Sequence, residues 1–207
     1  MTLASRLAAG VAELGVEVGP AAQDRLLAYL ELMAKWNRVY NLTALRNPGE
    51  WVTHHLLDSL SVLPHVRGPL VVDVGSGAGL PGLALAMARP DWQLVSVEAV
   101  DKKAAFQRQV AAELALANVK VEGRRVEGVV LAGGADTVVS RAFSSLADFV
   151  NLTRHLLKPD GQWAAMKGRL PQEEIAALPA GVRVREVIEL KVPGLHAERC
   201  VVMMERG

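Results

Sequence analysis

The chain has 207 residues, enough for one sizeable hydrophobic core with a short appendage, and 51% of them are hydrophobic, which excludes a disordered protein. With 23 basic and 22 acidic residues the formal net charge is +1, so a broad surface that coats nucleic acid is not expected, whereas a local basic patch is. The single cysteine, Cys200, excludes an internal disulfide framework and fits a reducing compartment.

The chain contains no segment typical of membrane insertion or export. No apolar run approaches the roughly 20 residues that a bilayer-spanning helix needs. The first residues carry Glu13 and Glu17 in an amphipathic pattern and lack the continuous apolar stretch of a signal peptide. We therefore expect a cytoplasmic protein that does not contact membranes.

Residues 1–64 are predicted to form an N-terminal helical extension. Apolar residues recur at helical spacing before and after Gly19-Pro20, which separates two helices. The repeats are Leu3, Leu7, Val11 and Leu14 in the first helix, and Leu26, Leu27, Leu30, Met33 and Ala34 in the second. Asn47-Pro48-Gly49 predicts a turn, and a third helix is expected over 54–63.

Residues 65–207 are predicted to form one domain in which strands and helices alternate. Strands are expected over 70–74, 93–98, 119–123, 135–140 and 162–167, and helices over 79–89, 102–116 and 145–157. A turn at 158–161 and a short helix at 173–178 complete this part. Two strands over 182–191 and 200–205 then follow with no helix between them, which predicts an antiparallel pair.

The fold class that follows is α/β. We expect a mostly parallel, seven-stranded, Rossmann-like sheet with helices on both faces and a C-terminal antiparallel hairpin. In such a sheet the ligand lies beyond the carboxyl ends of the first strands.

A glycine-rich turn follows the first predicted strand. Residues 71–82 read Val-Val-Asp-Val-Gly-Ser-Gly-Ala-Gly-Leu-Pro-Gly. Glycines let the backbone pass close to a nucleotide-like ligand, and the N-terminus of the following helix is expected to offer unpaired N–H groups. We interpret the segment as the opening unit of a nucleotide-cofactor domain.

Two cofactors fit this loop. Gly77-x-Gly79-x-x-Gly82 formally satisfies the dinucleotide fingerprint, with Glu98 at the distance expected of an acid that binds a ribose. Asp73-x-Gly75-x-Gly77-x-Gly79 instead fits an S-adenosylmethionine (SAM) pocket. There Asp73 would attract the ammonium or sulfonium group, and Glu98 would bind both ribose hydroxyls. The terminal antiparallel pair, by analogy of fold, favours SAM.

Six segments, in order and at matching intervals, resemble one family. They are Trp36-Asn37 with Asn41-Leu42-Thr43, His55-Leu56-Leu57-Asp58-Ser59-Leu60, the loop 73–82, Ser140-Arg141-Ala142-Phe143, Met166-Lys167-Gly168, and Val192-Pro193-Gly194-Leu195 with Glu198-Arg199. The chain resembles the RsmG/GidB methyltransferases over nearly its whole length. The resemblance implies transfer of a methyl group from SAM to N7 of a guanine, guanine 527, in bacterial 16S ribosomal RNA.

The resemblance also implies which residues contact SAM. By position they are Gly75, Leu80, Val126, Glu127 and Arg141, beside the Asp73, Gly77 and Glu98 of the loop pattern. The chain departs from the family where Glu98-Ala99 replaces Asp-Ser, Lys103 replaces Arg and Cys200 replaces His. A glutamate side chain reaches further than an aspartate, so these differences put in doubt the binding of the ribose by Glu98.

The implied chemistry needs alignment more than proton transfer, because guanine N7 has a free lone pair and no proton to lose. We therefore expect no general base. Arg141 is expected to position a ligand, either the target base or phosphate or the SAM carboxylate; a structural ion pair is the alternative. Lys167, at the end of the fifth strand, is a candidate contact to an RNA phosphate.

Further residues near these motifs have two interpretations each. Arg199 and Lys102 are weaker candidates for RNA phosphate, and a basic rim would comprise Arg38, Arg46, Arg124, Arg125 and Arg169, all of which also suit ordinary solvated surface. Phe143 either stacks on an exposed base or packs in the core. His54 and Asp58 have the spacing of metal ligands, but no third ligand is evident and no metal is expected. His55 and Asp58 are expected to fix their helix against the SAM domain.

The expected partner is 16S rRNA, within the 30S subunit or its precursor, and the expected oligomeric state is a monomer. Three alternatives stay open. They are a SAM enzyme with a small-molecule or protein substrate, an NAD-dependent oxidoreductase, and an RNA-binding assembly factor with a vestigial cofactor pocket.

Overall fold

The computed structural model describes residues 2–45 and 47–207, so Arg46 of the expected basic rim lies outside the described residues. The helices are α1 (Leu3–Leu14), α2 (Pro20–Tyr40), α3 (Asp58–Leu60), α4 (Gly82–Ala88), α5 (Asp101–Glu113), α6 (Leu146–Thr153) and α7 (Gln172–Ala176). The strands are β1 (Leu70–Val74), β2 (Gln93–Val97), β3 (Val119–Glu122), β4 (Ala135–Arg141), β5 (Leu157–Lys167), β6 (Val182–Glu189) and β7 (Cys200–Arg206).

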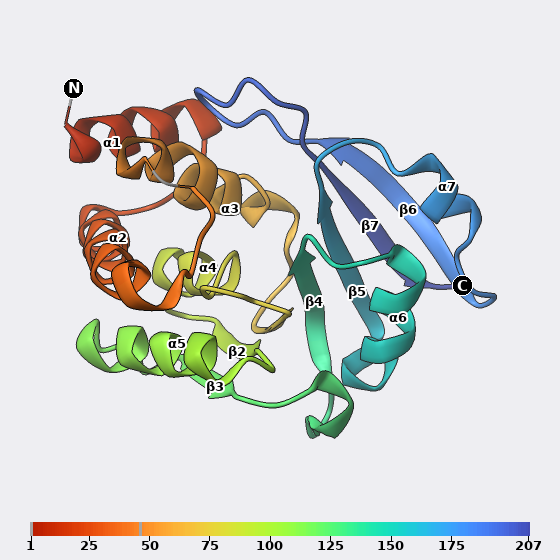
Figure 1. Ribbon diagram of the computed structural model, residues 1–207. Helices are drawn as coiled ribbons and strands as arrows, with labels where there is room; N and C mark the ends of the chain where they lie inside the picture. Colours follow the sequence, from red (N-terminus) through yellow and green to blue (C-terminus); the bar gives the residue numbers. More distant parts are fainter. Residues whose placement is uncertain (1, 46) are drawn as a thin grey trace.

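The strands form one sheet in the order β3-β2-β1-β4-β5-β7-β6. Strands β1 to β5 pair in parallel, and β7 runs antiparallel to both β5 and β6. Figure 1 shows helices α1 to α5 gathered on one side of this sheet and α6 and α7 on the other. The predicted α/β fold with a C-terminal antiparallel pair is confirmed.

Several predicted boundaries are wrong: the helix predicted over 145–157 ends at Thr153 and the one predicted over 102–116 ends at Glu113. Three other differences have a local reason. Helix α4 begins at Gly82 rather than Gly79, because positive φ angles at Gly77 and Gly79 keep that stretch in a turn. Strand β5 begins at Leu157, because residues 158–161 are taken up by a register shift against β4 and not by a separate turn. The third N-terminal helical segment begins at Val52, as a π-helical turn (Val52–Leu57) that runs directly into α3.

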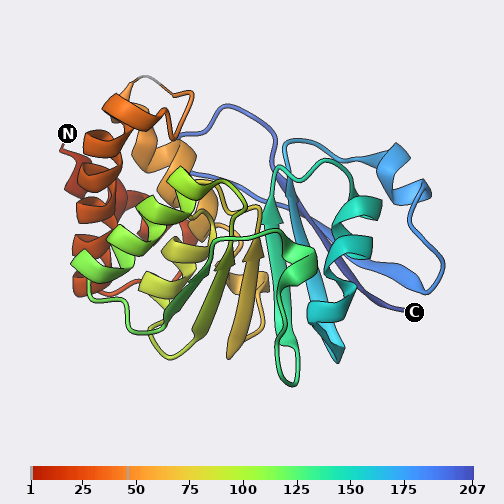
Figure 2. The same cartoon turned by 60° about the horizontal axis from the view of Figure 1, so that its bottom comes forward.

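Two buried clusters fill the two faces of the sheet. One joins side chains of α1, α2, α4 and α5 with Val71, Leu94 and Val139 from the sheet. The other packs α6 against the opposite side of the strands, at Val72 and Val138. Figure 2 shows the N-terminal helices stacked beside α4 and α5, so the segment 1–64 extends the layer that covers the first face. The boundary between 64 and 65 stays a prediction.

Local signals account for the ends of the N-terminal helices. The Thr2 side chain accepts a hydrogen bond from the Ser5 N–H, and Gly15 ends α1 in a left-handed conformation (φ +66°). Pro20 occupies the first turn of α2, where the N–H it lacks would have no partner. Across residues 2–45 and 47–207, no helix combines the length and hydropathy needed to cross a membrane.

Candidate functional site

The glycine loop lies at the carboxyl ends of β1 and β2, the edge expected for a ligand. Gly75, Gly77 and Gly79 have φ angles of +68°, +59° and +92°, a region that residues with a Cβ rarely adopt. The Gly75 N–H donates to the Val97 carbonyl at the end of β2. A Cβ on Gly77 would meet no atom within 4 Å, so this glycine borders open space in which a cofactor can lie.

Asp73 lies under the loop and is fully buried. Its Oδ2 accepts a hydrogen bond of 2.7 Å from the Gly82 N–H, the first residue of α4. This bond corrects the expectation of an open helix N-terminus, because the protein's own carboxylate already engages it. A pyrophosphate would need those N–H groups, so the geometry disfavours the dinucleotide interpretation.

The second carboxylate oxygen of Asp73 is buried and has no hydrogen-bond partner among the described residues. Burial raises the pKa of Asp73 to about 7, against the lowering effects of the Gly82 N–H and of Arg141. A cationic group of a bound cofactor would relieve this cost. The residues at the loop therefore fit a ligand that carries positive charge, as SAM does.

Glu98 follows β2 and fastens the loop. Its Oε2 accepts from the Gly77 N–H at 2.7 Å, and its Oε1 accepts from the Val100 N–H at 2.8 Å. The side chain is nearly buried, at 6% exposure. Each carboxylate oxygen can accept a second hydrogen bond, so a ribose contact is compatible with this arrangement and stays a prediction.

A buried polar network supports the loop from below, and sequence analysis missed it. The Gln107 side chain donates from Nε2 to the Gly77 carbonyl and to Ser76 Oγ, each at 2.8 Å. Ser96 Oγ lies 2.8 Å from Ser76 Oγ and 2.5 Å from Gln107 Oε1. The available signal was a glutamine on the buried face of α5, beside Ala104 and Val110.

Tyr29 is a second residue that the sequence analysis did not single out. It lies in α2, is fully buried, and donates from its hydroxyl to the Ala78 carbonyl at 2.9 Å. Burial raises the pKa of Tyr29 above its ordinary range, so the hydroxyl stays protonated as a donor. The N-terminal segment thus holds the glycine loop directly.

The other expected cofactor residues lie along the same edge. Leu80 is nearly buried, and its N–H donates to the Ser76 carbonyl within the loop. Val126 and Glu127 begin a 3-10 turn after β3; Val126 is buried and Glu127 is exposed. The fold brings these three residues to the carboxyl edge with Gly75, as predicted; their contact with SAM stays a prediction.

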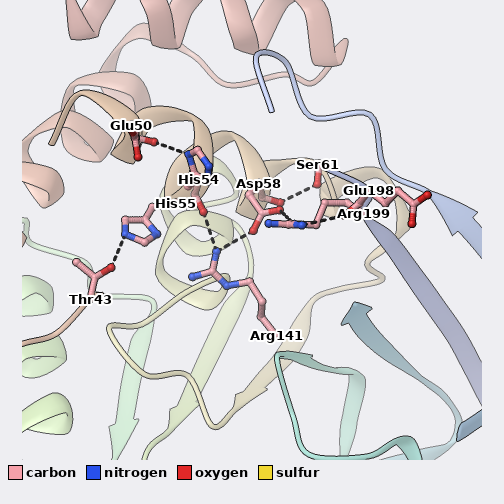
Figure 3. Close-up of polar contacts among 9 residues, drawn as sticks. All are labelled: Thr43, Glu50, His54, His55, Asp58, Ser61, Arg141, Glu198 and Arg199. Atoms are coloured by element: carbon pink, nitrogen blue, oxygen red, sulfur yellow. Dashed lines mark hydrogen bonds and ion pairs between the residues drawn. The ribbon is translucent and has the colours of Figure 1, made fainter. Parts of the chain in front are cut away.

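Arg141, the last residue of β4, is held by an ion pair. Its Nη1 donates to Asp58 Oδ2 at 2.9 Å and to the His54 carbonyl at 3.2 Å. Arg199, just before β7, donates from Nε to the other oxygen, Asp58 Oδ1, at 2.9 Å. Figure 3 shows Asp58 between the two guanidinium groups. Asp58 therefore links its helix to the ends of two strands, as expected. The structural ion pair, given above as the alternative role of Arg141, is present and engages one of its guanidinium nitrogens.

Lys167 occupies the expected edge at the end of β5, but its side chain is mostly buried. The side chain is 11% exposed and pairs with Glu174 at 2.8 Å. It also donates to the Phe143 carbonyl at 3.2 Å. Two of the three N–H donors of Lys167 are thus engaged within the protein, which leaves one for a phosphate. Phe143 is partly buried and packs on Phe149 with ring centroids 5.4 Å apart, as in the core interpretation.

The two histidines have separate partners. His54 Nδ1 lies 3.1 Å from the Glu50 carbonyl, and His55 Nε2 lies 3.0 Å from Thr43 Oγ1. His55 thus contacts the N-terminal segment itself. Of the two side chains expected to link this helix to the SAM domain, Asp58 makes that link among the described residues. Burial and the nearby Arg141 lower the pKa of His55 to about 4, so the ring is neutral near pH 7.

A cavity of about 430 Å³ lies between the π-helical turn and the ends of β4 and β5. Its walls include Asp58, Arg141, Lys167 and Arg199. Arg141 lies at the boundary between this cavity and the glycine-loop edge, since its own strand pairs with β1. The site therefore has two adjoining parts, a loop suited to a cofactor and a cationic cavity beside it.

The fold is the one that SAM-dependent methyltransferases have. The chain is similar to the crystal structure of a SAM-dependent methyltransferase from Aquifex aeolicus, with a TM-score of 0.58, 21% identity, and coverage of 79% of this chain and 96% of that one. Of the two cofactors that fit the loop, SAM is the cofactor of this class.

The chain belongs to the GidB family, rRNA small subunit methyltransferase G, whose model matches residues 22–203. It is 56% identical over 209 residues to the ribosomal RNA small subunit methyltransferase G of Aromatoleum aromaticum, covering 99% of both chains. It is 52% identical over 204 residues to the protein of the same name from Laribacter hongkongensis, again covering 99% of both. The family resemblance of the sequence motifs is confirmed.

Proposed function

We propose that this protein transfers a methyl group from SAM to N7 of a guanine in 16S rRNA, the guanine at position 527 in family terms. The observation that carries the proposal is the cationic cavity beside the glycine loop, in a chain of the rRNA small subunit methyltransferase G family. A cavity lined by two arginines suits a phosphate-bearing acceptor. The rRNA acceptor itself is taken from the names of the relatives.

We propose that the cofactor lies on the glycine loop. Gly75, Gly77 and Leu80 would pass their backbone close to it, because no side chain fills the space above Gly77. Glu98 would receive the ribose hydroxyls on its remaining lone pairs. Val126 and Glu127 would border the adenine, and Asp73, buried beneath the loop, would act on the cationic end through its charge and not by direct contact.

When bound, SAM would supply an electrophilic methyl group on a sulfonium: the N7 lone pair would form the new N–C bond as the C–S bond breaks, and the C–S electron pair would stay on sulfur. The protein's task is to align the two reactants and to exclude water from the path between them. The one carboxylate that lines the cavity, Asp58, accepts from two arginines and is not placed as a proton acceptor. This arrangement agrees with a reaction that removes no proton.

Arg141 is proposed as a positioning residue between cofactor and acceptor. Of its three guanidinium nitrogens, the described residues engage only Nη1. Nε and Nη2 stay available to a ligand carboxylate, a guanine O6 or a phosphate. Lys167 would support this edge through its contact with the Phe143 carbonyl, and would offer its third N–H donor to a phosphate.

We further propose that the acceptor is the 30S particle or its precursor, met by a monomer in the cytoplasm. A net charge of +1 gives little of the non-specific attraction that accumulates from many phosphate contacts. Recognition would then depend on the folded particle. Tight binding to an arbitrary RNA hairpin that does not weaken with salt would contradict this.

The test incubates the purified protein with methyl-labelled SAM and 30S particles from cells that lack the corresponding gene. Free 16S rRNA from the same particles serves as the second acceptor. Label at a single N7-methylguanine is the expected result, with the particle as the better acceptor. If SAM binds but neither RNA acquires label, the rRNA proposal fails and small-molecule or protein acceptors come next. If the protein binds the particle without transferring methyl, an assembly role replaces it.

A further inference from the structure

The cavity beside Arg141 carries an excess of positive charge. Its lining contains the cations Arg141, Lys167 and Arg199 and one carboxylate, Asp58. Lys167 is neutralised by Glu174, which lies outside this lining. Among the described residues, which do not include Arg46, two arginines then share one carboxylate, and a single positive charge is left over. A phosphodiester carries one negative charge, so the cavity is matched to a single phosphate group.

Arg199 has a donor to spare for such a group. Its Nε donates to Asp58 and its Nη1 to the Glu198 carbonyl at 2.8 Å, while Nη2 has no partner among the described residues. Asp58 is 3% exposed and accepts from Arg199 on one oxygen and from Arg141 on the other. A buried carboxylate with two ion pairs fixes the orientation of both guanidinium groups. Arg199 is therefore held in place before a ligand arrives.

His55 adds a second observation that points to a ligand. It lines the cavity and is 7% exposed. Its Nδ1 is buried and has no hydrogen-bond partner in the part of the chain that the structure describes. Buried polar atoms are nearly always paired, because an unpaired one costs about 1–3 kcal/mol. Nucleobase edges carry donors and acceptors that would pair with this nitrogen.

The cavity also continues along the surface. A second hollow of about 480 Å³ shares Lys167 and Gly168 with it and follows the segment 167–174. Arg169 on that segment is exposed. This hollow holds Glu173 and Glu174 beside its two basic residues, so it adds space rather than net positive charge. An adjoining hollow suits a polymer, in which one nucleotide enters the cavity and its neighbour lies outside.

We propose that this cavity receives the acceptor nucleotide, with Arg199, positioned by Asp58, on its phosphate and His55 Nδ1 on its base. This assignment rests on the proposed function and deepens it. It gives Arg199 a role that differs from cofactor binding, because the guanidinium holds the RNA backbone. Loss of Arg199 should therefore weaken binding of the RNA acceptor and leave the affinity for SAM unchanged.

The test compares Arg199→Ala with Arg183→Ala in the labelled-SAM assay on 30S particles. Arg183 is a matched control because it also forms an ion pair, with Glu205, and lies exposed on β6. Losing a hydrogen bond to a charged group lowers affinity about 10- to 100-fold. Arg199→Ala should therefore raise KM for the particle by that factor. SAM affinity, measured by calorimetry, should stay within about twofold for both variants.

Salt dependence separates a phosphate contact from a structural role. Log affinity falls as log salt concentration rises, and each phosphate contact makes that slope steeper by about 0.7–0.9. The slope should therefore be less steep by this amount in Arg199→Ala and unchanged in Arg183→Ala. Arg199→Lys keeps the charge and should retain the slope while raising KM. This variant also serves if Arg199→Ala fails to fold. His55→Phe should raise KM without changing the slope.

The outcomes separate failure of the proposed function from failure of the cavity assignment. If the wild-type protein transfers no methyl to any rRNA, the proposed function fails and the cavity assignment fails with it. If the wild type is active but Arg199→Ala has an unchanged KM and salt slope, the assignment alone is overturned. A fall in SAM affinity as large as the rise in KM would also overturn it, because Arg199 would then act through the cofactor.

Discussion

Asp73→Asn tests the burial of a carboxylate beneath the glycine loop. Burial raises the pKa of Asp73 to about 7 from an ordinary value of 3.8. Each pKa unit corresponds to about 1.4 kcal/mol, so ionised Asp73 lowers the free energy of unfolding by about 4 kcal/mol at high pH. The folded state binds the proton more tightly than the unfolded chain. Stability is therefore lost as the pH rises from about 4 and becomes level above about 7.

The asparagine variant cannot ionise, so its stability lacks this decline. Integrating the two titrations between pH 5 and pH 8 gives a change of roughly 2–3 kcal/mol in the difference in unfolding free energy between variant and wild type, in favour of the variant. Urea unfolding followed by circular dichroism at pH 5, 6, 7 and 8, without SAM, measures it. Contributions from other titrating groups, including His55, cancel in the difference.

The effect of Asp73→Asn on SAM binding is expected to be opposite to its effect on stability. Asparagine can still accept from the Gly82 N–H, but it offers no negative charge to a cationic cofactor. We therefore expect Asp73→Asn to be more stable at pH 8 and to bind SAM more weakly. A stability difference that stays constant within about 0.5 kcal/mol over this pH range would refute the reasoning.

Three further substitutions probe the same edge, and a fourth, Gly15→Ala, serves as a control at the end of α1. Tyr29→Phe removes the donor to the Ala78 carbonyl and should lower the free energy of unfolding by about 1 kcal/mol, with weaker SAM binding in calorimetry. Gly77→Ala and Gly15→Ala each place a Cβ in open space, at φ +59° and +66°. Each should lower the free energy of unfolding, measured in urea, by about 1–2 kcal/mol. Only Gly77→Ala should impair SAM binding. Equal SAM affinity in these two variants would mean that the cofactor does not lie over the loop. Arg141→Ala should sharply reduce transfer to 30S particles, and a folded variant with normal transfer would end its positioning role.

The sequence by itself was sufficient to predict the architecture. Short apolar runs separated by helical repeats predict a parallel sheet, since each pattern reflects a local backbone period. Gly75, Gly77 and Gly79 predict the loop because each has the positive φ that favours glycine. The ordered motifs predicted the family, and through it the cofactor. All of these signals lie within short stretches of the chain.

The tertiary structure decided which side chains meet. Asp58 contacts Arg141 and Arg199, which are 83 and 141 residues away in the sequence, and no local pattern encodes those pairs. Tyr29 reaches the loop from a helix 49 residues earlier for the same reason. The direction of Asp73 toward Gly82, and with it the closed helix N-terminus, follows from packing in the layer between α4 and the sheet. Periodicity fixes which face of an element is buried, whereas the partner of a buried polar group depends on how those faces are brought together.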